Sequence, residues 1–311
     1  MKKILLMAVC IIMMSMTASA ISINKALLDH NGTVTLYDGL QEAINASSDG
    51  DVIYLTLGTF KGPYTVSKKI SIRGTGATSI IDGDVSISIP GAPKLTSPVL
   101  EALAVSGIVS VNSEVNDIIL RKCKMANIEI NANVDGAVLD RCNMTEFLTL
   151  SSYIKGMTVV NTIINNLRAK TGATNNTTFV NCYITRLTTD NFSATIINSI
   201  ILYGGYYNYS SDTRSITISS TVLLNSLINA NFITIGASSV AQNCYKVNNP
   251  STDKASLQTN NYIGTDGTIV GHFGGDTPYT LEPSVPKVTS SSLDLDMEKK
   301  ELKVKLTVSP Q

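Results

Sequence analysis

The chain contains 311 residues, in which 24 basic side chains balance 24 acidic ones and aromatic residues make up only 6%. Charged residues account for 15% of the sequence and form no basic block. This composition argues against nucleic acid or an anionic membrane surface as the binding partner. The length suits one elongated domain with a small appendage.

The first twenty residues have the three parts of a secretory signal peptide. Lys2 and Lys3 precede an apolar run over residues 4–14, and Ala18-Ser19-Ala20 offers a cleavage site. The apolar run is too short to span a bilayer, and no later segment is a transmembrane candidate. We therefore expect cleavage after Ala20, with 22 basic and 24 acidic residues left in the mature chain. The expected destination is the periplasm, the outer cell surface or the medium.

An extended lead-in is expected over residues 21–36, followed by one short capped helix. Asp38 precedes residues 39–46, in which Leu40, Ala43 and Ile44 fall on one helical face. Such a helix would cover the first open edge of a stack of strands, because bare strand edges invite aggregation.

Residues 118–247 carry a pattern that returns once every twenty or so residues, a period typical of a solenoid. Each copy ends a β-branched run with a polar residue and then a small one. The pairs are Lys122-Cys123, Arg141-Cys142, Asn161-Thr162, Asn181-Cys182, Asn198-Ser199 and Asn243-Cys244. The composition predicts three short strands per coil, stacked in parallel ladders about 4.8 Å apart. We expect the asparagine amides to point inward and bond the backbone of neighbouring coils.

The small residues of these pairs predict a buried column. We expect the cysteines of this column to be free, buried thiols. Because Cys123 and Cys142 lie in adjacent coils, a disulfide between them remains an alternative. The sequence has no Cys-x-x-Cys motif and no His cluster, so no metal site is predicted.

The beginning of the repeat region resembles a known family. After the short helix come Gly-Asp-x-Ile-x-Leu-x-x-Gly-Thr-Phe at residues 50–60, Lys-x-Ile-x-Ile-x-Gly at 68–74, and a further strand-like run at 79–83. This order resembles the opening of the pectin-lyase-like superfamily of right-handed parallel β-helices, which includes pectin methylesterases, pectate lyases and chondroitinase-type lyases. Residues 264–286 resemble the close of exported Bacteroidetes β-helix proteins, most of them without assigned activity.

Enzymes of that superfamily place acidic and basic residues on the outer face of one parallel sheet, and alternation predicts such a strip here. One outward column would hold Glu129, Thr149, Arg168 and Thr188, and the next Asn131, Ser151, Lys170 and Asp190.

A polysaccharide lyase is the enzymatic alternative that this strip allows. Lys170 would remove the proton beside a uronic carboxylate, Arg168 would neutralise that carboxylate, and Glu129 or Asp190 would bind Ca²⁺. Solvated side chains on an exposed sheet explain the same residues. The two carboxylates lie three coils apart, which argues against a calcium cluster, and outside this alternative no cofactor is expected.

Motifs of the related enzymes are missing. The chain has no Trp, so the Arg-Pro-Trp segment of pectin methylesterases is absent, and no group of three aspartates resembles that of polygalacturonases. Asp135 and Asp140 are close in sequence, but Asp135-Gly136 predicts a turn and Asp140 is interpreted as a residue near a turn. His30 and His272 lie far apart beside Gly- or Asn-containing loops, so neither predicts a catalytic role.

A glycine-rich loop over residues 203–209 interrupts the coil spacing and holds Tyr203, Tyr206, Tyr207 and Tyr209. Tyrosine rings with one wet edge stack on sugars or anchor protein contacts. The alternative is a loop folded over the flank of the solenoid.

The sequence thus predicts an all-β chain: a signal peptide (1–20), a right-handed parallel β-helix of about ten coils (21–277) and a C-terminal β hairpin (278–311). The hairpin would cap the last coil or begin an interaction module. The leading function is a non-catalytic scaffold that binds polysaccharide or another cell-surface component through the Tyr203–Tyr209 loop, with Glu129 and Asp190 as further contacts. A lyase or hydrolase acting on acidic glycans and a purely structural, adhesive protein are the alternatives. The sequence makes no prediction of oligomeric state.

Overall fold

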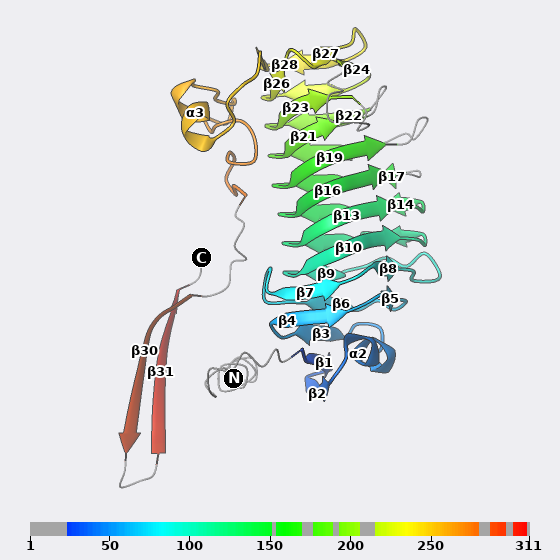
Figure 1. Ribbon diagram of the computed structural model, residues 1–311, viewed down its shortest axis with the longest axis vertical. Helices are drawn as coiled ribbons and strands as arrows, with labels where there is room; N and C mark the ends of the chain where they lie inside the picture. The colour runs from blue at the N-terminus through cyan, green and yellow to red at the C-terminus, as the bar shows by residue number, and fades with distance from the viewer. Residues whose placement is uncertain are drawn as a thin grey trace.

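The computed structural model describes residues 24–150, 154–169, 177–188, 193–205, 215–279, 287–296 and 301–309. It is a parallel β-helix of about nine turns, which confirms the predicted fold with one turn fewer than expected (Figure 1). The expected signal peptide lies outside the described residues.

Two long sheets, A and B, form most of the β-helix, and their strands follow the stacking order of the coils. Sheet A contains β2 (Thr33–Tyr37), β1 (Ala26–His30), β3 (Val52–Leu55), β6 (Ser71–Arg73), β9 (Leu100–Glu101), β12 (Ile119–Arg121), β15 (Val138–Asp140), β18 (Thr158–Val160), β20 (Thr177–Val180), β22 (Ala194–Ile197), β25 (Val222–Leu224) and β28 (Val240–Gln242). Sheet B contains β4 (Gly58–Lys61), β7 (Ser79–Asp82), β10 (Ala104–Val111), β13 (Lys124–Ile130), β16 (Asn143–Leu150), β19 (Ile163–Ala169), β21 (Tyr183–Leu187), β23 (Ile200–Gly204), β26 (Leu227–Asn229) and β29 (Tyr245–Val247), with β5 (Tyr64–Val66) and β8 (Val85–Ile87) pairing beside it.

Short strands close the third side of the coils. A three-stranded sheet C holds β11 (Val115–Asn116), β14 (Val134–Asp135) and β17 (Ile154–Lys155), and a two-stranded sheet holds β24 (Ile216–Ile218) and β27 (Ile233–Ile235). Alternating residues of all sheets point inward and form one continuous apolar core, in which Phe179, Ile72 and Leu100 are fully buried.

From β9 onward, eight successive coils turn from sheet A to sheet B through one residue in the left-handed conformation. Its φ lies between 48° and 53° at Ala102, Lys122, Arg141, Asn161, Asn181, Asn198, Asn225 and Asn243. Among residues with a Cβ, asparagine tolerates this conformation best, because its short polar side chain bonds locally. The repeating polar residue of the sequence therefore marks a turn in the backbone. The Asn225-Ser226 pair belongs to the same series and was missed, because the preceding coil is longer than the others.

The small residue that follows closes the turn with a hydrogen bond. The hydroxyls of Thr162, Ser199 and Ser226 each donate to the carbonyl oxygen two residues earlier at 2.8 Å, and Cys182 Sγ makes the same contact at 3.3 Å. The predicted buried column is confirmed, although Cys244 at its end is only half-buried.

The four described cysteines, Cys123, Cys142, Cys182 and Cys244, are free thiols. Burial raises the pKa of Cys142 and of Cys182 to about 12, so both thiols stay protonated and unreactive at neutral pH.

The asparagine amides differ from the prediction. Instead of bonding the backbone of adjacent coils, Asn198 Nδ2 donates to the side-chain oxygen of Asn181 at 2.9 Å, and Asn243 does the same to Asn225 at 2.8 Å. The left-handed turn directs these side chains toward the edge of the β-helix, where a later segment of the chain covers them.

That segment, residues 260–279, is called the strap here. It runs back along the turn edge past successive coils (Figure 1). Thr265 Oγ1 bonds Asn225 at 2.8 Å, Asp266 bonds Asn198 at 3.3 Å, the carbonyl oxygen of Gly274 bonds Asn181 at 3.0 Å, and Thr277 Oγ1 bonds Asn161 at 3.0 Å. Gly275 fits because it has no Cβ, which would lie 2.1 Å from Asn181 Nδ2. Asparagine thus occupies the turns that the strap covers.

An apolar cluster fixes the strap and the helix before it. Helix α3 (Lys254–Thr259) begins at Asp253, whose side chain accepts the N–H of Ser256, and it buries Leu257. Leu257 and Val270 pack on Ile200 and Leu227 of sheet B. No local sequence pattern predicts that α3 and the strap cover sheet B here.

The N-terminal end also differs in detail from the prediction. Residues expected to be an extended lead-in form the antiparallel hairpin β1–β2 around Asn31-Gly32. Helix α2 (Leu40–Ala46) buries Leu40, Ala43 and Ile44 as predicted. Its N-cap is Gly39, without a side-chain cap, because Asp38 pairs with Lys25 instead.

The C-terminal hairpin is confirmed as β30 (Lys287–Asp296) and β31 (Glu301–Ser309), which pair with each other in a sheet of their own. The strap leads toward them from the middle of the β-helix, where the Tyr279 hydroxyl bonds Asn143. A capping role for the hairpin stays a prediction. In the described part of the chain, no helix is long and apolar enough to cross a membrane.

Substitutions at two left-handed positions should have opposite effects on stability. We expect Asn181→Ala to lower the free energy of unfolding by about 2 kcal/mol. The variant replaces a residue that tolerates the left-handed conformation and loses the hydrogen bond to the strap. Ala102→Gly should raise it by about 1 kcal/mol. Urea denaturation measures both values, and a destabilised Ala102→Gly variant would contradict this role of the turn.

The strap should also make stability depend on pH. His272 is 6% exposed and packs against Tyr183 and Phe273 at ring distances of 5.0 and 3.9 Å. Burial lowers the pKa of His272 to about 4 from 6.5. The unfolded chain therefore binds the proton first as the pH falls, and stability present above pH 6.5 is lost toward pH 4.

Between pH 7.5 and 4.5 the wild type should lose about 2.5 kcal/mol more unfolding free energy than His272→Phe. Denaturation curves at the two pH values give this difference. Equal losses in the two proteins would show that His272 is not buried in its neutral form.

Candidate functional site

The outer face of sheet B carries the column that the sequence predicted, in part. Glu129, Thr149 and Arg168 pair in register on β13, β16 and β19. Thr188 does not continue the column: it is 2% exposed and donates its hydroxyl to the carbonyl oxygen of Leu167 at 3.1 Å. Strand β21 ends at Leu187, and the side chain of Thr188 is buried instead of facing outward.

Arg168 is exposed and stacked on an aromatic ring. Its guanidinium carbon lies 4.5 Å from the centre of the Phe147 ring, within the range of a cation–π contact. No carboxylate among the described residues pairs with it. The ring therefore orients the guanidinium while its N–H donors remain directed to solvent.

A second pair of the same kind lies one coil further along. The guanidinium carbon of Arg186 is 5.8 Å from the ring centre of Tyr203, which is its register partner on β23. Tyr203 in turn lies 5.2 Å from the Phe232 ring. The structure thus brings Arg168 and Tyr203, predicted as parts of two separate sites, onto one face. We call Phe147, Arg168, Arg186 and Tyr203 the arginine–aromatic strip.

Charge is uneven along this face. Strands β19, β21 and β23 contain two arginines and no acidic residue, whereas β13 and β16 contribute Glu129 and Glu146. Glu146 accepts a hydrogen bond from Asn127 at 2.8 Å. The positive charges of the strip therefore lie on β19 and β21, whereas Glu146 lies next to Phe147 on β16.

Five residues of the predicted sites lie outside the described residues: Lys170, Asp190, Tyr206, Tyr207 and Tyr209. The structure describes the chain on either side, because β19 ends at Ala169 and β23 includes Tyr203.

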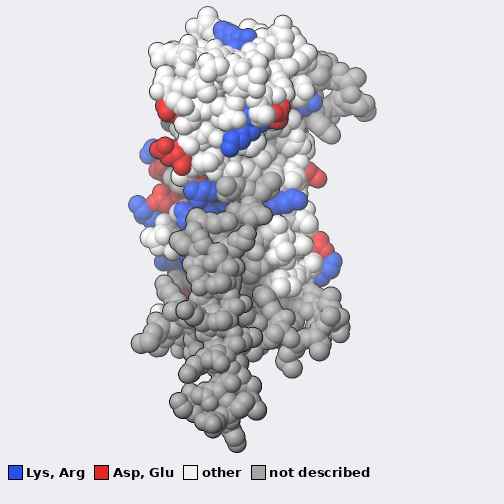
Figure 2. Space-filling model, turned by 90° about the vertical axis from the view of Figure 1, so that its left-hand side faces the viewer, with Lys and Arg blue, Asp and Glu red and all other residues white. Residues whose placement is uncertain are grey.

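The strap borders the strip. It covers the first residues of the sheet B strands, with His272 against Tyr183 and Gly271 close to Ile200. Figure 2 shows the edge of the β-helix seen from the side of the strap, with acidic and basic residues interspersed rather than gathered by sign. In Figure 1 the strap lies next to sheet B, to which β13, β16 and β19 belong.

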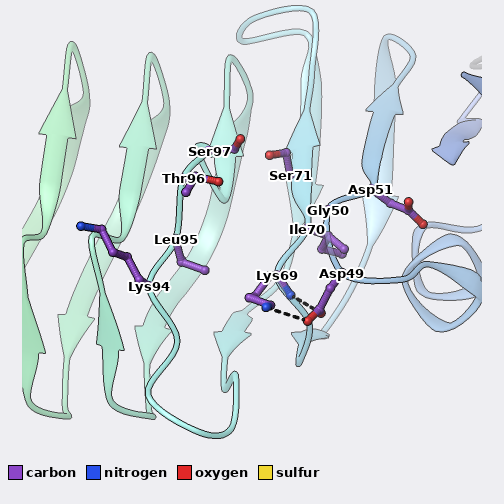
Figure 3. Close-up of a pocket in the computed structure, with 10 residues that line it drawn as sticks. All are labelled: Asp49, Gly50, Asp51, Lys69, Ile70, Ser71, Lys94, Leu95, Thr96 and Ser97. Carbon is purple, nitrogen blue, oxygen red and sulfur yellow. Dashed lines mark hydrogen bonds and ion pairs between the residues drawn. The ribbon is translucent and has the colours of Figure 1, made fainter. Parts of the chain in front are cut away.

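A second polar region is a pocket of about 330 Å³ between the loops that precede β3, β6 and β9. Its charged groups pair with one another or with neighbours: Lys69 with Asp49 and Lys94 with Asp117, both at 3.1 Å. The backbone N–H and the ammonium of Lys69 hold the pKa of Asp49 below its usual range. Lys94 and Asp51 point away from the centre on opposite sides (Figure 3). The pairing indicates a structural role.

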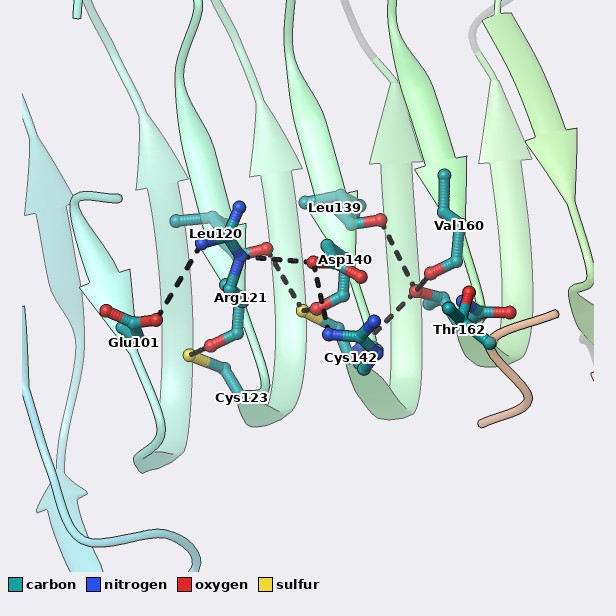
Figure 4. A network of polar contacts seen from close by, with 12 residues as sticks. Glu101, Leu120, Arg121, Cys123, Leu139, Asp140, Cys142, Val160 and Thr162 are labelled. Atoms are coloured by element: carbon teal, nitrogen blue, oxygen red, sulfur yellow. Dashed lines mark hydrogen bonds and ion pairs between the residues drawn. The ribbon is translucent and has the colours of Figure 1, made fainter. Parts of the chain in front are cut away.

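Alternating charges on sheet A form a ladder of ion pairs (Figure 4). Arg73 Nε lies 3.0 Å from Glu101, and Arg121 lies 3.9 Å from Glu101 and 3.0 Å from Asp140. Asp135 pairs with Lys155 on sheet C at 3.4 Å. Asp135 is thus the last residue of β14 rather than part of a turn, and Asp140 is the last residue of β15, next to the turn as predicted; the two pair with different cations on different sheets.

The two histidines have unrelated places. His30 Nδ1 lies 2.8 Å from Asp51, whose other oxygen accepts the N–H of Ser48 at 2.7 Å, so the contact fixes a loop near α2. His272 belongs to the strap. No group of three or more His, Cys, Asp or Glu within the described ranges has the arrangement of a metal site.

Sequence reasoning missed Phe147 and Arg186. Phe147 follows a bulge in β16, where the register shifts after Met144, so simple alternation places it wrongly. Arg186 precedes buried Leu187 in the alternation, and that signal was available in the sequence.

Comparisons with known proteins place the chain in no family: no protein-family model, curated protein or solved structure matches it significantly.

Proposed function

We propose that the protein is an exported, non-catalytic scaffold that binds an anionic polysaccharide along the arginine–aromatic strip. The observation that carries the proposal is that Arg168 and Arg186 each lie over an aromatic ring, at 4.5 and 5.8 Å, on neighbouring coils of one face. Export rests on the sequence of the first twenty residues.

The chemistry of the strip suits a sugar acid. A guanidinium presents paired N–H donors to a carboxylate or sulfate, and an aromatic edge packs against the apolar face of a sugar ring. Tyr203 is half-buried, so its ring is fixed before a ligand arrives. Fixed groups lose little conformational entropy on binding.

The repeat of the β-helix suits a polymer. Coils stack about 4.8 Å apart, close to the length of one sugar unit in an extended chain. A polysaccharide lying along the axis would therefore meet Arg168 and Arg186 with successive units. The flexible, repeated contacts of a polymer also add avidity.

Binding is favoured over lyase chemistry for a physical reason. A lyase must bring a base and a charge-neutralising group to the same sugar carbon. The described residues of the strip supply guanidiniums stacked on rings, and a guanidinium stays protonated and does not act as that base. Glu129 is separated from Arg168 by the coil of Thr149.

Removing the arginines should weaken binding to polygalacturonate. We expect about a fivefold loss of affinity for Arg168→Ala and at least twentyfold for Arg168→Ala with Arg186→Ala, since each exposed ionic contact contributes modestly. Arg168→Lys should fall between wild type and alanine, because it keeps the charge and loses the planar stacking. Isothermal titration calorimetry at low and high salt measures these values.

Lys155→Ala, a cation of sheet C whose side chain is 77% exposed, serves as the control and should bind as the wild type does. Unchanged affinity in the double arginine variant would contradict the strip. Unsaturated product that forms with the wild type and disappears in Lys170→Ala would replace binding with the lyase mechanism.

A further inference from the structure

The N-terminal end of sheet A finishes in an open strand edge. Strand β2 is the outermost strand of the sheet and pairs with β1 on one side, and within the described residues no strand pairs with its other side (Figure 1). Residues 33–36 of β2 are exposed, with Val34 at 37% and Leu36 at 53%. Helix α2 covers the core at this end with Leu40, Ala43 and Ile44.

The composition of β2 is unusual for an edge that stays in water. Proteins protect such edges with lysine, proline, a bulge or an inward charge, because a bare edge recruits other strands. The sequence of β2, Thr-Val-Thr-Leu-Tyr, contains no lysine, no proline and no charged residue. Its pairing with β1 has no bulge over all five residues. The edge is therefore built to pair.

The hairpin geometry shows which backbone groups face outward. Asn31 and Gly32, with φ of 52° and 85°, form a two-residue turn, so the flanking pair His30 and Thr33 exchange hydrogen bonds. Bonded and non-bonded pairs alternate along an antiparallel ladder. The N–H and C=O groups of Val34 and Leu36 are therefore the ones that point to the open edge.

We propose that β2 pairs with β2 of a second copy of this chain, antiparallel and about a twofold axis at Thr35. In that register Val34 exchanges both backbone bonds with Leu36 of the partner subunit, and Leu36 does the same with Val34 of the partner subunit. The backbone N–H and C=O groups that face the open edge in one copy thus bond those that face it in the other copy. Each apolar side chain of the pair also lies opposite an apolar side chain. A twofold interface requires such self-complementarity, and this five-residue strand has it.

The chain's own ends do not fit this edge as well. Cleavage after Ala20, as the sequence predicts, leaves three residues before Asn24, which reach about 10 Å and are too few to turn back past β1 and pair. The C-terminal hairpin pairs β30 with β31 in a sheet of its own. The other end of sheet A, β28, belongs to the parallel ladder, so joining it to β2 would be a head-to-tail contact that grows into filaments.

Pairing through β2 joins two β-helices end to end. Each particle would then carry two arginine–aromatic strips, which would raise the apparent affinity for a long polymer. The dimer itself does not depend on the proposed glycan binding, and its test uses no ligand.

Cysteine cross-linking tests the register of the proposed pair. Thr35 faces itself across the axis as a non-bonded pair, with Cα atoms about 4.5 Å apart, which suits a disulfide. Thr33 would lie about 14 Å from Thr33 of the partner subunit. Under mild oxidation, the mature Thr35→Cys protein should form a covalent dimer, and Thr33→Cys, which retains the same native cysteines, should not.

Sedimentation of the mature protein tests the interface without cross-linking. Wild type at about 100 μM should have twice the mass of Leu36→Lys, which places a charge in the edge. Val240→Lys, a 50%-exposed position on β28, should remain dimeric. A monomeric wild type, equal cross-linking at positions 33 and 35, or monomers in both lysine variants would overturn the proposal, the last result in favour of head-to-tail contact.

Discussion

The structure depends on one backbone constraint, a residue held in the left-handed conformation where each coil from β9 onward turns from sheet A to sheet B. This turn fixes where the sheet B strands from β10 onward begin, so successive coils stack in register. It also directs the side chain of the turn residue to the edge. At Asn161, Asn181, Asn198 and Asn225 the amide binds the strap, whereas the amide of Asn243 bonds Asn225.

Because the strands of successive coils pair in register, side chains at equivalent positions form columns on the surface of each sheet. Phe147, Arg186 and Tyr203 fall at equivalent positions on their coils, and Arg168 occupies the adjacent column. The same stacking on sheet A places Arg73, Glu101, Arg121 and Asp140 beside one another. Opposite charges on sheet A neutralise each other, whereas the arginines of sheet B lie on rings. This difference is why we propose sheet B as the binding face.

The fold could be predicted because its signal is repeated. The pair of a polar and a small residue recurs from coil to coil over residues 118–247. The local sequence pattern also predicted the buried column, helix α2 and the C-terminal hairpin. The hairpin turn at Asn31-Gly32 was also readable and was overlooked. Three features depend on contacts between distant residues and were not predictable from alternation: the strap on Asn181, the bulge before Phe147 and the buried side chain of Thr188. The candidate site was therefore located only in part.

The most direct test of the account follows the arginine side chains during ligand binding. Nuclear magnetic resonance of the ¹⁵N-labelled mature protein resolves Nε–H signals, which Arg→Lys variants assign. On titration with oligogalacturonate, the account predicts saturable shifts for Arg168 and Arg186 and little change for Arg73 and Arg121, whose guanidiniums are paired with carboxylates. Shifts confined to the sheet A arginines, or no shift at Arg168 while the ligand binds, would contradict the account.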